Sequence, residues 1–163
     1  MIPFRPALLA LALTLPGPLS AQAAVDLGGL SADPDAPVEV TADQLSVEQA
    51  TGTAVFSGNV VVGQGNLRLA AAQVRVVYDD ATGAIARFAA SGGVTVVTET
   101  EAAEAEEAEY DLTTGLLTMS GNVLLTQGQN ALSAERMVVD VEAGTARMEG
   151  RVRTVFQPGA QGQ

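Results

Sequence analysis

Carboxylates are the side chains of this sequence with the greatest capacity for chemistry. The chain has 19 acidic residues against 8 basic ones, all arginine, and it has no histidine, lysine or cysteine. Carboxylate oxygens bind hard cations such as calcium, and paired carboxylates can hydrolyse glycosidic bonds. A calcium site and a glycosidase are therefore the first functions to test against the spacing of the acids. Six of the acids crowd one alanine-rich segment: Glu99, Glu101, Glu104, Glu106, Glu107 and Glu109.

The spacing favours neither chemistry. The acidic segment lacks the Asp-x-Asp-x-Asp-Gly pattern of a calcium loop, so a solvated acidic face is the preferred interpretation. Other acids recur at expected turns, and no His, Cys or Lys is present to activate a nucleophile. We expect no enzyme, no metal and no cofactor, with a calcium-binding β protein as the alternative. Because Ala and Glu favour helices, residues 98–109 are expected to form an exposed loop or a short helix.

The acids belong to a unit that the chain repeats four times, over residues 42–62, 72–96, 105–125 and 134–154. Each unit centres on a glycine that follows an acid by four residues, and a second glycine comes later. The central glycines are Gly52, Gly83, Gly115 and Gly144, and the acids before them are Glu48, Asp79, Asp111 and Asp140. The second glycines are Gly58, Gly92, Gly121 and Gly150.

The unit has the pattern of a β-hairpin. Apolar and polar residues alternate before the central glycine, as in residues 74–78, which is typical of a half-buried strand. The acid and the glycine are turn residues, while Ser57-Gly58-Asn59 and Ser120-Gly121-Asn122 indicate a second tight turn or a bulge. The sequence therefore predicts an all-β fold, a jellyroll or stacked-hairpin sandwich of about 14–16 short antiparallel strands.

The two ends of the chain differ from the repeats. Residues 1–23 have one arginine, an apolar run and Ala21-Gln22-Ala23, which predicts a signal peptide cleaved after Ala23. Residues 24–37 are expected to be a flexible lead-in, residues 38–156 the β domain, and residues 157–163 a disordered tail. The net charge of −11 disfavours nucleic acid and anionic membrane surfaces as partners.

Three phrases of the sequence resemble the OstA-like family of lipopolysaccharide transport, namely residues 38–45, 56–65 and 119–128. The resemblance implies an open, twisted β-jellyroll in the periplasm. It implies a carrier that shields lipid A acyl chains in an apolar groove on the way from the inner to the outer membrane. Its partners would be lipopolysaccharide, the inner-membrane C and outer-membrane D components of the system, and further copies joined head to tail.

The alternation of side-chain direction along the strands predicts which residues line the groove. It puts Val38 with Val40, Val94 with Val96, and Tyr110 with Leu112 on shared faces. Another three predicted lipid-binding residues lie four positions beyond a turn glycine: Phe56, Met119 and Met148. The resemblance implies acyl-chain contact at Val38, Val40, Val96, Tyr110 and Leu112. The alternative is a closed sandwich whose core holds the same side chains.

The terminal strands are the expected partner edges. Neither has an internal proline or a lysine to block pairing, and their charges are of opposite sign. The alternative function is a β-sandwich adaptor that joins envelope components by strand-edge pairing without binding lipid. The edge residues are Val38, Glu39, Val40 and Thr41 at one end, and Arg151, Val152, Arg153, Thr154, Val155 and Phe156 at the other.

Overall fold

The computed structural model describes residues 24–26 and 35–156, and every regular element in these residues is a β-strand. The predicted signal peptide and C-terminal tail lie outside the described residues. Three residues of the expected lead-in form strand β1. The strands are β1 (Ala24–Asp26), β2 (Val38–Thr41), β3 (Gln44–Glu48), β4 (Thr53–Gln64), β5 (Leu67–Tyr78), β6 (Ile85–Val97), β7 (Glu101–Asp111), β8 (Leu116–Gln127), β9 (Asn130–Asp140), β10 (Thr145–Glu149) and β11 (Arg153–Val155).

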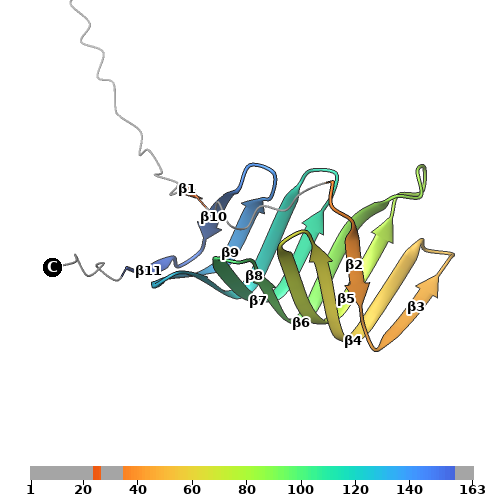
Figure 1. Ribbon diagram of the computed structural model, residues 1–163, viewed down its shortest axis with the longest axis horizontal. Coiled ribbons are helices and arrows are strands. Elements are labelled where there is room, and N and C mark those ends of the chain that lie inside the picture. The colour runs from red at the N-terminus through yellow and green to blue at the C-terminus, as the bar shows by residue number, and fades with distance from the viewer. Residues whose placement is uncertain (1–23, 27–34, 157–163) are drawn as a thin grey trace, which may run out of the picture.

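The strands form one antiparallel sheet in the order β1-β10-β9-β8-β7-β6-β5-β4-β2, with β3 also on β4 and β11 also on β9. From β4 to β10 each strand pairs with its neighbours in sequence, because the turn glycines close successive hairpins (Figure 1). Gly52, Gly83, Gly115 and Gly144 all have positive φ, as a tight turn requires. The all-β prediction and the open antiparallel jellyroll are confirmed.

The second glycines bend the strands. The register of β4 with β5 shifts between Ser57 and Val60, and that of β8 with β9 shifts between Ser120 and Val123. These are the two Gly-Asn sites, and Asn59 and Asn122 both have a φ of 47°. A bulge of this kind adds a residue to one strand and turns it, so the prediction of bulges is confirmed. The described residues form eleven strands, which are fewer and longer than expected because the bends turn the strands without ending them.

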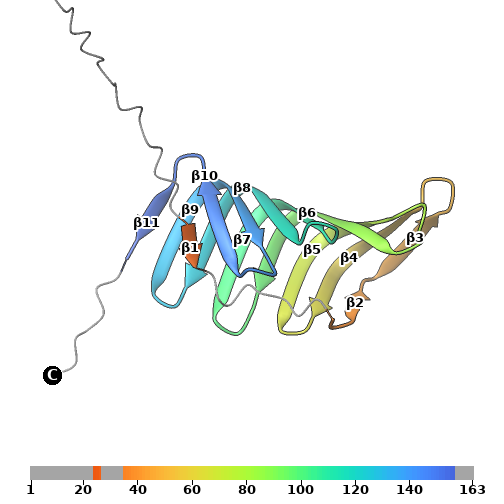
Figure 2. The same ribbon diagram turned by 90° about the horizontal axis from the view of Figure 1, so that it is seen from above.

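The bends divide the sheet into two halves that face each other (Figures 1 and 2). Half 1 contains β3, β10 and the segments 53–57, 73–78, 85–91, 107–111, 116–120 and 136–140. Half 2 contains β2, β11 and the segments 60–64, 67–71, 94–97, 101–105, 123–127 and 130–134. Apolar side chains of both halves form one buried cluster, which occupies the space between them.

The acidic segment is the main correction to the sequence-based expectation. Residues 101–111 form strand β7 inside the sheet, and not an exposed loop or helix. Ala103, Ala105 and Ala108 face the core, while Glu104 and Glu109 face solvent. Helix propensity is overridden here because two neighbouring strands satisfy the β7 backbone and the alanines fit a tightly packed interior.

Candidate functional site

The interior between the halves contains all nine predicted lipid-binding residues. Val94, Val96 and Met119 are fully buried in the apolar cluster. The other six are partly buried and pack against the same cluster: Val38, Val40, Phe56, Tyr110, Leu112 and Met148. Alternation and the repeat positions thus selected residues that are buried or partly buried in the interior. Their contact with a lipid remains a prediction.

The two halves are in close contact in this conformation. A cavity of about 30 Å³ lies between them, lined by Val38, Val62 and Gln64 of half 2 and by Phe88, Tyr110 and other side chains of half 1. A buried water needs about 10–15 Å³, so this cavity could hold only a few water molecules and no acyl chain. The apolar interior therefore consists of two facing surfaces that pack closely together.

Tyr110 lies where the interior meets the turns of half 1. Its side chain is partly buried against the core cluster. Burial raises the pKa of the Tyr110 phenol above its ordinary value of 10.0, and the nearby Glu142 carboxylate acts in the same direction.

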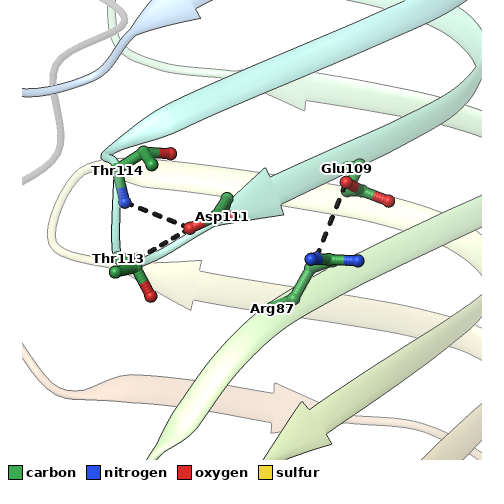
Figure 3. Close-up of polar contacts among 5 residues, drawn as sticks. All are labelled: Arg87, Glu109, Asp111, Thr113 and Thr114. Atoms are coloured by element: carbon green, nitrogen blue, oxygen red, sulfur yellow. Dashed lines mark hydrogen bonds and ion pairs between the residues drawn. The ribbon is translucent and has the colours of Figure 1, made fainter. Parts of the chain in front are cut away.

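The side chain of Asp111 stabilises the turn that follows Tyr110. Asp111 Oδ1 accepts hydrogen bonds from the backbone N–H groups of Thr113 at 2.9 Å and Thr114 at 3.1 Å (Figure 3). These bonds, led by that from Thr114, lower the pKa of Asp111. Arg87 Nε lies 3.6 Å from Glu109 Oε1 on the outer face, where both side chains are about half exposed. Such an exposed pair contributes little stability, and both contacts are structural.

Residues 39–145 match the family described as LptA/(LptD N-terminal domain) LPS transport protein, where LPS is lipopolysaccharide. The chain belongs to this family. An uncharacterised protein of Rhizobium meliloti is 27% identical over 141 residues, which are 80% of this chain and 76% of the relative. A solved structure of LptH, the LptA-homologous periplasmic component of the lipopolysaccharide transport device of Pseudomonas aeruginosa, matches with a TM-score of 0.70. That match has 21% identity, covers 78% of this chain and 99% of LptH, and shows the shared fold.

Membership confirms the predicted resemblance and places the chain among lipopolysaccharide transport proteins and not among enzymes. No helix in the described residues is long and apolar enough to cross a membrane. In the same residues, no group of three or more acidic side chains is arranged to hold a metal ion. The acids of β7 are spread along the length of the strand, and Glu101 lies on the inner face while Glu104, Glu106, Glu107 and Glu109 are exposed.

Sequence reasoning missed the polar side chains of this jellyroll's interior. Glu101 is 4% exposed and Gln64 is 7% exposed, and both point inward from half 2. Gln127 Nε2 donates a hydrogen bond of 2.6 Å to Glu101 Oε1. The available signal was the alternation itself, since Glu101 shares the phase of Ala103 and Ala105. It went unused because a dense acidic run suggested solvent exposure throughout.

The outer surface offers a different environment. The outer face of half 1 has an open hollow of about 640 Å³, and its lining includes Gln73, Arg75, Ser91, Glu107 and Arg136. These polar and charged groups are solvated, so the hollow has no means of sheltering an acyl chain. Among the surfaces of the described residues, the facing inner surfaces are the better candidates for lipid contact.

The predicted partner edges lie at opposite ends of the sheet. In the described residues β2 pairs only with β4, and β11 pairs only with β9. At the β10 end, β1 covers Thr145–Arg147. The β11 side chains are all exposed. Both ends thus present strand backbone to a possible partner, and their pairing with one remains a prediction.

Proposed function

We propose that this protein is a periplasmic carrier that shields the lipid A acyl chains of lipopolysaccharide between its two half-sheets during transport to the outer membrane. The observation that carries the proposal is the continuous cluster of apolar side chains on the inner face, where Gln64 and Glu101 are the buried polar residues of the described chain. It runs across every strand from β4 to β9, and its side chains come from both halves. Family membership supports lipopolysaccharide as the cargo.

The energetics of acyl transfer favour such a surface. Burying one methylene is worth about 0.8 kcal/mol, so a chain of roughly a dozen carbons resists entering water by about 10 kcal/mol. A surface of valine, leucine, alanine and methionine replaces water along the whole chain. Successive strands present similar side chains, so a lipid can move along the track without meeting a deep energy minimum.

Loading requires the half-sheets to part. The hydrogen bonds that hold the sheet run between neighbouring strands within each half, while side-chain packing joins the halves across the interior. Separation of the two halves therefore breaks apolar side-chain contacts and leaves the hydrogen bonds between neighbouring strands intact. The entering acyl chains restore those contacts, which makes opening and loading a single exchange of one apolar surface for another.

The carrier would work as one part of an envelope bridge. We infer that the inner-membrane C component delivers the lipid and that the outer-membrane D component receives it, with further copies of this chain between them. The open β2 and β11 edges support such end-to-end contacts. The sequence contains no phosphate-binding Gly-x-x-x-x-Gly-Lys loop. The resemblance to this transport family implies that an ATP-driven partner in the inner membrane supplies the energy.

Site-specific photo-crosslinking tests the proposal. A photoreactive residue at Val96 or Tyr110, on the inner face, should capture lipopolysaccharide in cells that assemble an outer membrane. The same residue at Thr95 or Glu109, next in the chain and on the opposite face, is the matched control. Capture at the control positions alone would reverse the assignment of the faces. Association with envelope partners without capture at any position would favour the adaptor function.

A further inference from the structure

Glu101 is the one carboxylate that the described structure buries without satisfying. Its Oε1 accepts the hydrogen bond from Gln127, while its Oε2 has no partner. All the arginines in the described residues are exposed, so the protein provides no cation on the inner face. An unpaired buried acceptor costs free energy, and such groups are retained mainly where they serve a function.

The position of Glu101 shows what it could contact. It is the first residue of β7 and lies opposite Gln127, the last residue of β8, at the free end of half 2. One step further inside on the same face are Ala103 and Leu125, each with 0% exposure. A lipid whose acyl chain lies against Ala103 and Leu125 therefore has its chain-to-sugar junction beside Glu101.

The same polar position recurs along the groove. Gln64 follows Gly58-Asn59 as Gln127 follows Gly121-Asn122, at the matching end of its strand. Gln64 lines the cavity between the halves, which shows that this position faces the groove. Its amide donates to the Ala36 carbonyl at 3.3 Å, so its donor is already in use. Among the buried side-chain nitrogen and oxygen atoms of the described residues, Glu101 Oε2 is the one without a hydrogen-bond partner.

We propose that Glu101, held by Gln127, is a headgroup-selecting residue that accepts a hydrogen bond from a hydroxyl or amide N–H at the chain-to-sugar junction of the bound lipid. This inference rests on the proposed carrier function and names the group that the groove recognises. A carboxylate attracts donors and repels phosphate, so it favours lipids whose polar junction carries hydroxyl or N–H groups. It also orients the guest, with its chains inward and its phosphates toward solvent.

Two neutral amphiphiles with the same alkyl chain provide the test. Dodecyl maltoside carries hydroxyl donors, whereas dodecyldimethylamine N-oxide has an acceptor and no donor. Each is titrated by calorimetry below its critical micelle concentration into the full mature protein and into Glu101→Leu. The wild type should prefer the maltoside relative to the N-oxide, and Glu101→Leu should reduce that preference about tenfold. Binding of the N-oxide itself should change little.

Two further variants make the result specific. Glu104→Leu alters an exposed glutamate of the same strand and should leave the preference unchanged. Glu101→Gln retains one acceptor oxygen and should keep an intermediate preference, which also covers the case that the leucine variant does not fold. A higher thermal midpoint for Glu101→Leu than for the wild type would support the view that the unpaired Glu101 oxygen destabilises the wild-type protein.

The outcomes separate this inference from the proposed function. If neither amphiphile nor lipopolysaccharide binds the wild type, the carrier function fails. If both bind and the preference is the same in wild type and Glu101→Leu, the carrier stands and the selecting role of Glu101 is overturned.

Discussion

Asn122 Nδ2 donates a hydrogen bond of 2.6 Å to Oε1 of Glu106, from β8 to the neighbouring strand β7 at the bend of both. Asn59 makes the same contact with Asp43 at 2.9 Å, again across 16 residues of sequence. Arg151 and Glu135 repeat it with an arginine donor. Each donor directly follows the second glycine of its unit and has a positive φ. These contacts fix the bends that bring the two halves face to face.

The first prediction concerns the backbone at this bend. Asn122→Val should lower the free energy of unfolding by about 1–2 kcal/mol more than Asn122→Gly, since a β-branched residue is strained at positive φ. Both variants remove the bond to Glu106, so their difference isolates the backbone. Urea denaturation measures it, and equal losses would show that the bend tolerates a branched side chain.

The second prediction concerns acid stability. Hydrogen bonds from the backbone N–H and hydroxyl of Thr82, and from the N–H of Ala81, lower the pKa of Asp79 below its ordinary value of 3.8. A lowered folded-state pKa contributes stability above the unfolded pKa, and that contribution is lost as the pH falls through the folded value. Asp79→Asn should therefore lose less stability than the wild type between pH 5 and about 3.

Asp80→Asn is the matched control for this effect. It removes the same charge from the same turn, and Asp80 makes no hydrogen bond within the described residues. Thermal unfolding followed across the acid range compares the three proteins. If Asp79→Asn and Asp80→Asn show the same pH dependence, net charge and not the turn bonds governs acid stability.

The third prediction tests the parting of the halves. Val62 of half 2 and Leu117 of half 1 line the same narrow cavity, and the natural chain has no cysteine. A Val62→Cys, Leu117→Cys variant should bind lipopolysaccharide while both thiols are free and lose most of that binding once a short thiol-to-thiol crosslinker joins them, since the strands of the two residues are too far apart for a direct disulfide. Fluorescence displacement before and after crosslinking measures the change, with each single cysteine variant as control. Unchanged binding by the linked protein would show that the lipid enters without separation of the halves.

Periodicity explains how much of the architecture the sequence could predict. The spacing from Asp111 to Gly115 predicts a turn, because a carboxylate binds local N–H groups and glycine accepts positive φ. Gly121-Asn122 predicts a bulge for the same reason. The alternation of Val94 and Val96 identifies the inner face. These are local rules that act within a few residues, and the structure follows them.

The predictions failed where distant strands decide the outcome. The acidic segment becomes β7 because β6 and β8 present unpaired backbone on either side, which no local pattern reveals. The partnership of Glu101 with Gln127 spans 26 residues and depends on strand register. The closeness of the two halves also depends on tertiary packing, so strand alternation by itself favoured a closed core and only the family resemblance favoured an open groove.

The last prediction concerns the N-terminal edge, where β2 pairs only with β4 in the described residues. Head-to-tail association of copies needs N–H groups that point away from β4. Successive N–H groups of a strand point to opposite sides of it. Of the two single variants Glu39→Pro and Val40→Pro, one therefore loses an N–H that points toward β4 (inward) and the other loses an N–H that points away from β4 (outward). The variant that loses the outward N–H should stay monomeric with little change in its thermal midpoint. The variant that loses the inward N–H should have a lower thermal midpoint and should still associate.

Light scattering over a concentration series measures the mass of each variant, and Val155→Pro tests β11 in the same way. A wild-type mass that never exceeds the monomer, or association that survives every proline, would rule out strand pairing as the link between copies.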